Sequence, residues 1–209
     1  MVRVVKKPDE RRADIIAAAG QLFLSKGYDS ATMKDVMDHL HIAKGTIYHY
    51  FKSKEELLEA VITSVAEAEL LRRKALVDSI DGSALERLEQ LIAAGADRSR
   101  EDDHEALLED LHKPANAGMH IRLLAKVVTM QAPIYAALFE QGCEEGIFTV
   151  ARPLECAEFL LSGIQFLTDM GIYGWTPEQL ERRWQAFPQL IESQLKAPQG
   201  SFSFLLKYR

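Results

Sequence analysis

The chain has 209 residues, which is enough for one medium domain or for a small domain joined to a larger one. Apolar residues make up 47% and charged residues 27%, an ordinary balance for a globular protein that needs no disulfide or metal to stabilise its core. The net charge of −6 is uneven, because residues 1–54 carry ten basic and six acidic side chains and residues 55–209 carry fifteen and twenty-five. A basic head on an acidic body favours nucleic-acid binding confined to the head, with chance unevenness as the alternative.

The sequence has no feature that predicts export or membrane insertion. Residues 1–7 lack the apolar run of a signal peptide, and no apolar run approaches the ~18 residues needed to cross a bilayer. The two cysteines, Cys143 and Cys156, do not have the spacing of a metal site. We therefore expect a cytoplasmic protein with free thiols and no membrane partner.

Apolar periodicity predicts helices almost throughout, and no stretch shows the period of two that is expected of a half-buried strand. The first helix begins after Pro8 and Asp9 and ends at Gly27. Thr32 caps a second, short helix that ends near Leu40, and a third short helix runs from about 43 to 50. Two short helices joined by a tight turn are typical of a helix-turn-helix, whose second helix enters the DNA major groove.

A long helix opens at the capping box that starts with Ser53. Further helices are predicted at 84–97, 104–112, 117–141, 153–172 and 177–196. Pro133 and Pro188 predict kinks in two of them. The expected fold is all-α with about nine helices: a three-helix DNA-binding domain at 1–54 with its helix-turn-helix at about 32–51, a helical domain at 55–197, and an apolar but irregular tail at 198–209.

The third predicted helix has an outward face suited to DNA, made up of Lys44, Gly45, Thr46, Tyr48 and His49. A face without a carboxylate avoids repulsion from phosphates, and Gly45 lets the backbone approach DNA closely. Thr46 can offer its methyl group to thymine or its hydroxyl to a base or phosphate. Tyr48, His49 and Lys54 are suited to phosphate oxygens. Phe51 is expected in the core, and Tyr50 is left open between core and surface.

Residues 32–56 resemble the signature of the TetR/AcrR family of transcriptional regulators, T-x-x-x-[IV]-A-x-x-A-G-V-S-x-G-[TS]-[LI]-Y-x-[HY]-F-x-[SN]-K-E-E-L. Residues 17–27 are similar to the family's A-x-x-L-F-x-x-x-G segment. The part of the chain that resembles the family is about 60 residues of 209. The signature is matched in place by Thr32, Val36, Lys44, Gly45, Thr46, Ile47, Tyr48, Tyr50, Phe51, Lys54, Glu55, Glu56 and Leu57.

Two of the departures from this signature are informative. The usual turn glycine is His41, a residue type that tolerates positive φ, and the usual serine that opens the recognition helix is Ala43. Loss of a capping hydroxyl typically costs about 1 kcal/mol. We therefore expect a less rigid head and no DNA contact from the side chain of Ala43.

The resemblance implies a homodimeric repressor that binds double-stranded operator DNA and is released by a small, largely apolar ligand. It implies DNA contacts from Thr32 together with the outward residues above, and a dimer formed by the helices at 153–172 and 177–196. The effector pocket would lie in the C-terminal domain. Candidates on its middle helices are Leu107, Leu111, Met119, Leu123, Val127, Met130, Ile134, Phe166 and Met170, although an ordinary core is the alternative for each.

Other functions have weaker support. The chain shows no phosphate-binding glycine loop, nucleophile elbow or H-E-x-x-H motif, so we predict that it is not an enzyme and needs no cofactor. His104, His112 and His120 are eight residues apart, which is not the spacing of a helix-borne metal pair, so no metal is predicted. An effector-independent DNA-binding architectural or cell-division factor on the same fold is the main alternative, followed by a binding module that has lost its DNA function.

Overall fold

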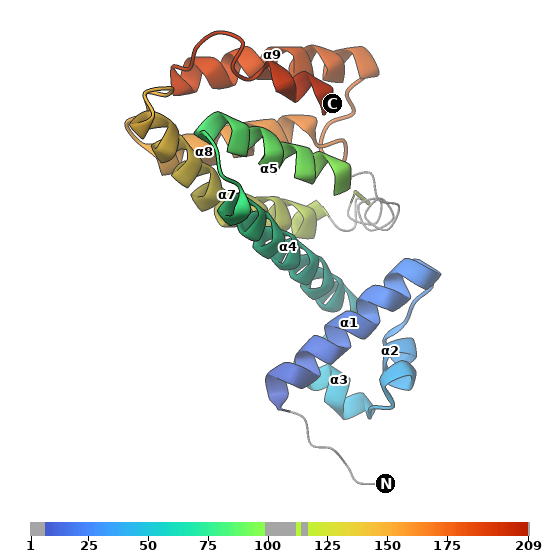
Figure 1. The fold of residues 1–209 in the computed structure, drawn as a ribbon. Helices are drawn as coiled ribbons and strands as arrows, with labels where there is room; N and C mark the ends of the chain where they lie inside the picture. The colour runs from blue at the N-terminus through green and yellow to red at the C-terminus, as the bar shows by residue number, and fades with distance from the viewer. Residues whose placement is uncertain (1–6, 99–111, 114–116, 209) are drawn as a thin grey trace.

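The computed structural model describes residues 7–98, 112–113 and 117–208, and all regular structure in these ranges is helical (Figure 1). The described helices are α1 (Pro8–Lys26), α2 (Met33–Leu40), α3 (Lys44–Tyr50), α4 (Lys54–Ser79), α5 (Ala84–Arg98), α7 (Ala117–Glu144), α8 (Pro153–Thr168), α9 (Pro177–Leu195) and the 3-10 helix η2 (Ser203–Lys207). They confirm the all-α prediction for the described residues. The predicted helix at 104–112 falls almost wholly outside them.

The first three helices form a small head at one end of the molecule (Figure 1). Their apolar faces meet in a core in which Val36 and Ile47 are fully buried and Phe51 is 1% exposed. Tyr50, which the sequence left open, is half-buried and packs against the same core. The inward side of α3 packs against this core and so holds the helix in place. The opposite side of α3 faces solvent.

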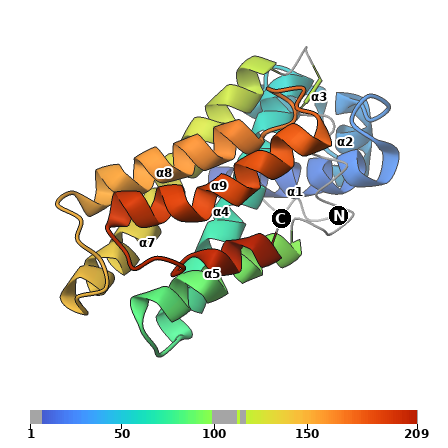
Figure 2. The same ribbon diagram turned by 90° about the horizontal axis from the view of Figure 1, so that it is seen from above.

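Helix α4 connects the head to the body. Its first turns bury Leu57, Leu58 and Val61 in the head core, whereas Val77 near its other end is buried in the body core. Figures 1 and 2 show α4 running from the head into the layers formed by α5, α7, α8 and α9. One continuous helix therefore belongs to both hydrophobic cores.

Helix α7 is the central helix of the body, since it packs against α4, α5 and α8. It is long and apolar enough to cross a membrane by length and composition, although the sequence analysis found no uninterrupted apolar run of that kind. At its C-terminal end Gly142 lies against the ring of Phe148, where a Cβ atom would come within 2.1 Å of the ring. A glycine is therefore required for this close approach.

Among the described helices, the predicted boundaries agree to within about two residues except at the C-terminal ends of α7 and α8. Helix α7 was expected to end at residue 141 and extends to Glu144. Pro133 and Pro188 both lie inside continuous helices. Helix α8, expected to reach residue 172, ends at Thr168. The reason is local: the Asp169 carboxylate accepts the backbone N–H groups of Gly171 and Ile172 at 2.9 and 3.0 Å and turns the chain away from the helix axis.

The C-terminal segment is part of the body core. Phe202, Phe204 and Leu205 are each less than 9% exposed in or beside η2. The carboxylate of Glu192, itself buried, accepts the backbone N–H of Phe202 at 3.0 Å. The sequence predicted a separate tail from residue 198, but these apolar side chains fold back onto α9 and α5.

Truncation of Phe202 tests this arrangement. Because its ring is 2% exposed and stacks on Phe148, Phe202→Ala should lower the free energy of unfolding. The expected loss is about 3–5 kcal/mol, measured by urea denaturation. Leu71, which is 69% exposed on α4, is the control. Leu71→Ala should change the stability by less than about 0.5 kcal/mol. Equal effects of the two substitutions would show that the segment is not part of the core.

Candidate nucleic-acid interface

The N-terminus of α2 is fixed by a reciprocal capping box. The Thr32 hydroxyl accepts the Asp35 N–H at 3.1 Å, and the Asp35 carboxylate accepts the Thr32 N–H at 2.8 Å. The same carboxylate accepts the Thr32 hydroxyl and pairs with Lys26 of α1 at 2.9 Å. Thr32 thus lies at the predicted position, exposed, with its hydroxyl already engaged inside the protein.

Lys26 and Thr32 together hold the pKa of Asp35 well below its ordinary value, with the hydrogen bond from Lys26 as the largest cause. A carboxyl group whose pKa is depressed in the folded state stabilises that state above its unfolded pKa, and loses this effect as the pH falls towards the folded pKa. The link between α1 and α2 is therefore intact at neutral pH and weakens only in strong acid.

The turn between α2 and α3 has both unusual features that the sequence predicted. His41 adopts the left-handed conformation with φ 51° and ψ 45°, where glycine is the usual residue. Ala43 is the N-cap of α3 and supplies no side-chain hydrogen bond. The backbone still closes the turn, because the N–H of Ile42 reaches the carbonyl of Met37 at 3.0 Å.

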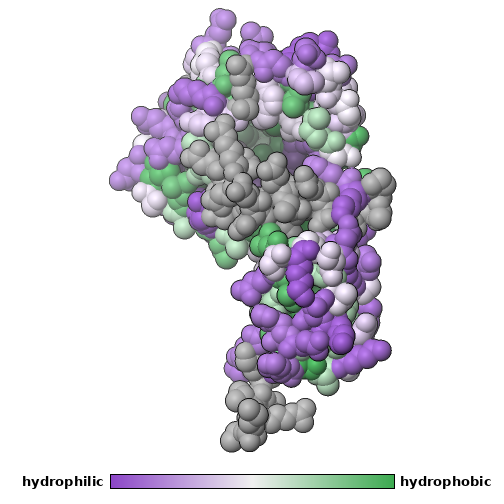
Figure 3. Space-filling model, turned by 90° about the vertical axis from the view of Figure 1, so that its right-hand side faces the viewer, coloured by the Kyte–Doolittle hydropathy of each residue, from purple (hydrophilic) through white to green (hydrophobic). Residues whose placement is uncertain are grey.

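The outward side of α3 carries the predicted contact residues. Lys44, Gly45 and His49 are exposed, and Thr46 and Tyr48 are half-buried. A Cβ atom at Gly45 would meet no other atom within 4 Å, so nothing inside the protein requires a glycine here. Hydrophilic side chains cover most of the visible face of the head in Figure 3.

Two lysines frame Tyr48 on this surface. The Lys44 ammonium lies 5.7 Å from the centre of the Tyr48 ring, and the Lys52 ammonium donates to the Tyr48 carbonyl at 2.9 Å. Lys52, which was not among the predicted contact residues, is exposed and follows directly after the buried Phe51. The sequence feature that could have identified Lys52 is its position one residue before the N-cap of α4. A cation at that position lies near the C-terminus of α3.

Lys54, which is predicted to contact phosphate oxygens, lies against the loop between α1 and α2. Its ammonium lies 4.1 Å from the centre of the Tyr28 ring and donates to the carbonyl of Asp29 at 3.3 Å. In this position the lysine joins the first turn of α4 to the loop between α1 and α2. Its role within the protein is to hold the head together, and a phosphate would have to share this cation.

The structure does not bring together the seven predicted pocket residues that it describes. Leu107 and Leu111 lie outside the described residues. Met119 is buried in the head core, and Leu123 packs against that core. Ile134 packs against the body core. These last three side chains therefore have structural partners in two different clusters.

An apolar groove of about 650 Å³ does lie between α7 and α8. Phe166 is the predicted residue that lines it; Val127 and Met130 are half-buried elsewhere on α7, and Met170 is exposed beyond the end of α8. The other apolar lining residues include Ile121, Leu124, Val128 and Phe159. Sequence periodicity could not identify them, because α7 shows apolar side chains on several faces.

Comparisons with known proteins agree with this geometry. Residues 15–61 match the family described as "Bacterial regulatory proteins, tetR family", and residues 101–190 match "Tetracyclin repressor-like, C-terminal domain". The HTH-type transcriptional repressor KstR2 of Mycobacterium tuberculosis is 26% identical over 149 residues, which are 71% of this chain and 74% of that protein.

Two further comparisons extend over most of the chain. The HTH-type transcriptional regulator YfiR of Bacillus subtilis is 28% identical over 160 residues, covering 74% of this chain and 76% of that protein. The crystal structure of a TetR-family regulator from Pectobacterium atrosepticum superposes with a TM-score of 0.66 at 20% identity, covering 93% of this chain and all of that one. This last likeness shows the fold.

Repair of the turn before α3 should stabilise the protein. His41→Gly removes a left-handed non-glycine residue, and we expect the free energy of unfolding to rise by about 0.5–1 kcal/mol. Ala43→Ser restores a capping hydroxyl and should add about 1 kcal/mol. Urea denaturation measures both. As a control, Gln21→Gly in the ordinary helical backbone of α1 should cost about 1 kcal/mol. A loss of stability in both repaired variants would contradict this description of the turn.

Proposed function

Because the chain belongs to the TetR family of bacterial transcriptional regulators, we propose that it is a dimeric repressor that binds operator DNA in the cytoplasm and is released from it by a small, largely apolar ligand. Its DNA-binding domain is residues 1–54, and its effector-binding and dimerisation domain begins at residue 55 and includes the C-terminal segment. The homology to repressors such as KstR2 supports the sign of regulation.

The exposed side of α3 is the observation that carries the proposal. Lys44, Gly45 and Thr46 form the first turn, Tyr48 and His49 follow, and none of the five is acidic. The first residues of a recognition helix are those that reach base edges. The open space around Gly45 allows the DNA backbone to approach α3. We assign Lys44, Gly45 and Thr46 to the base edges and nearby phosphates, and Tyr48 and His49 to phosphates.

Thr32 and Lys54 have supporting roles in this proposal. The Thr32 hydroxyl is held by Asp35 and caps α2. Thr32 is exposed, and we assign its backbone and methyl group to the DNA contact. Lys54 holds the loop at Asp29 and adds positive potential near the phosphates. Lys52, exposed at the C-terminus of α3, is a further phosphate contact.

The α8 helix supports the dimer. Phe159 is 67% exposed, and Phe166 and Leu154 on the same helix are 41% and 43% exposed. On the neighbouring α9, Leu190 is 56% exposed. Large apolar side chains gathered on two adjacent helices are typical of a surface that a second subunit covers. Two heads are also what a two-fold operator requires.

The groove between α7 and α8 supports the effector site. Its lining is largely apolar, and its volume of about 650 Å³ is in the range of small-molecule pockets. Phe159 and Phe166 belong to both the groove and the exposed face of α8. A second subunit on that face would close the groove on its open side, so that ligand binding and dimer geometry would be linked.

Selection of genomic fragments bound by the purified protein identifies the operator, and fluorescence anisotropy then measures affinity. Lys44→Ala should weaken binding and reduce the slope of log affinity against log salt by about one. Gly45→Ala should weaken operator binding by at least about tenfold, because the added methyl group would lie between α3 and the DNA. The same substitution should stabilise the folded protein by about 0.5–1 kcal/mol, because alanine has the higher helix propensity. Apolar compounds that bind the protein should release the operator.

Two substitutions of the same type serve as controls. Lys74→Ala removes an exposed cation near the far end of α4. Gly118→Ala changes an exposed glycine at the second position of α7, as Gly45 is at the second position of α3. Both should keep the wild-type operator affinity. If Lys44→Ala and Gly45→Ala also kept it, α3 would not be the recognition helix.

The dimer is tested by Phe159→Asp, which puts a charge at the centre of the proposed interface. We expect the dissociation constant to rise by at least about a hundredfold, because an unpaired buried charge costs several kcal/mol. Sedimentation equilibrium at micromolar concentration measures the mass. Leu71→Asp changes a similarly exposed residue on α4 and should remain a dimer. A wild-type protein that sediments as a single subunit would contradict the proposal.

A further inference from the structure

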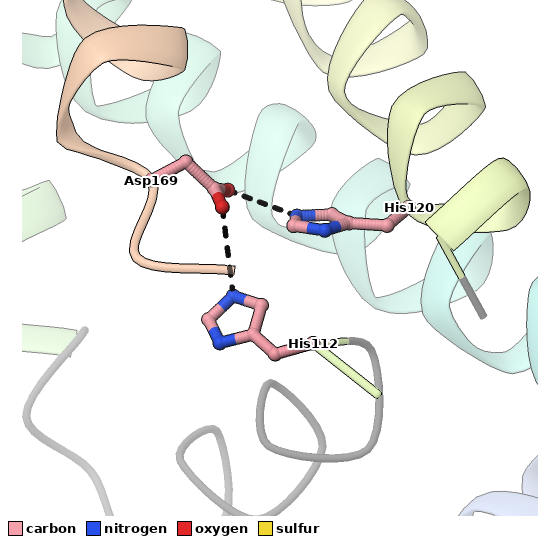
Figure 4. Close-up of side chains that lie close together, drawn as sticks. All are labelled: His112, His120 and Asp169. Carbon is pink, nitrogen blue, oxygen red and sulfur yellow. Dashed lines mark ion pairs between the residues drawn. The ribbon is translucent and has the colours of Figure 1, made fainter. Parts of the chain in front are cut away.

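A cluster of two histidines and one aspartate lies where the head meets the body. His120 of α7 is buried, with a side chain 5% exposed, and Asp169 at the end of α8 is partly buried, with a side chain 9% exposed. His112, in the short described segment before α7, completes the cluster. Figure 4 shows both imidazole rings directed at the two oxygens of the Asp169 carboxylate. The three residues come from three separate parts of the chain.

The distances within the cluster suit a small divalent cation. Nε2 of His120 lies 2.9 Å from Oδ2 of Asp169, and Nε2 of His112 lies 3.9 Å from Oδ1. One ligand atom from each residue lies within 4.8 Å of the other two. Ligand atoms of a tetrahedral zinc ion with bonds of 2.0–2.1 Å are about 3.3 Å apart. The observed separations lie on both sides of that value.

The surroundings hold the carboxylate in place for such a role. Oδ1 of Asp169 accepts the N–H groups of Gly171 and Ile172 at 2.9 and 3.0 Å. Hydrogen bonds of this kind orient ligating groups in metal sites. A Cβ atom at Gly171 would come within 2.3 Å of the His112 ring, so the glycine makes room for that imidazole. The loop after α8 thus both orients the carboxylate and admits the second histidine.

We propose that His112, His120 and Asp169 form a binding site for one zinc-type divalent cation per subunit. Two imidazoles and one carboxylate favour Zn²⁺, Co²⁺ or Ni²⁺ over Mg²⁺ and Ca²⁺, which prefer oxygen ligands alone. Three protein ligands leave a fourth position for water or for an oxygen or nitrogen atom of a small molecule. The groove residues Ile121 and Leu167 lie one and two residues along the chain from His120 and Asp169.

The position of the site links it to the head. Met119, next to His120, is buried in the head core, and Lys113, next to His112, pairs with Asp29 of the loop between α1 and α2 at 2.5 Å. A cation that fixes His112 and His120 relative to Asp169 therefore fixes two contacts between body and head. We accordingly expect its binding to change operator affinity; this consequence, unlike the site itself, rests on the proposed function.

Metal titration of the untagged, chelator-treated full-length protein tests the site. Co²⁺ should produce visible absorption bands that saturate at one ion per subunit, and Zn²⁺ should displace it. His112→Ala, a change at a half-exposed side chain, should weaken Zn²⁺ binding by at least about a hundredfold. Asp169→Asn retains an oxygen that can accept the N–H groups of Gly171 and Ile172, and should weaken Zn²⁺ binding to a similar degree. His39→Ala, an exposed histidine of α2, is the matched control and should bind as the wild type does.

Thermal unfolding provides a second measurement. Zn²⁺ should raise the unfolding temperature of the wild type and of His39→Ala but not that of His112→Ala, because a ligand stabilises only the state that binds it. If the wild type binds less than one ion per subunit, or if His112→Ala binds as tightly as the wild type, the proposed site is wrong.

Operator binding with and without Zn²⁺ tests the link to the head. Wild-type affinity should change by at least about fivefold, and that of His112→Ala should not change. Saturable metal binding with unchanged operator affinity would confirm the site and overturn the link. Absence of DNA binding under both conditions would overturn the proposed function, whereas the titration would still decide the metal site.

Discussion

The two ends of α4 are buried in two different hydrophobic cores, and the rest of the structure depends on that sharing. Leu57, Leu58 and Val61 complete the core that holds α3, and Val77 is part of the core under α5 and α9. Exposed ion pairs such as Arg122–Glu59 and Lys126–Glu67 also join α4 to α7. Exposed pairs of this kind contribute little on their own, so buried apolar contacts are the main connection between the head and the body.

The sequence was most informative about the head because the determinants there are local. A capping threonine, a short linker and a buried residue in every turn specify α2 and α3 within about twenty residues. The two departures at His41 and Ala43 could also be interpreted from sequence, since each affects only the turn in which it lies. The structure confirms the conformation of His41 and the missing side-chain cap at Ala43.

The parts that sequence did not predict depend on contacts between distant residues. The apolar residues after Pro198 have no helical period of their own, and they are buried because α9 and α5 offer a surface for them. The groove lies between α7 and α8, and periodicity along one helix does not show which residues of two helices line a groove together. His112 and His120 meet through Asp169, whereas their spacing along the chain gave no indication of a cluster.

In the proposed dimer, which places two heads on one duplex, the length of α4 has a geometric consequence. Its 26 residues form a rod of about 39 Å, at 1.5 Å per residue. A tilt of about 5° at the body end moves the other end of such a rod by about 3 Å. Half-sites one helical turn apart allow little error in the distance between recognition helices. A small shift in the packing of α4 against α7 would therefore move both recognition helices out of register with the major groove, even if it disturbed neither core.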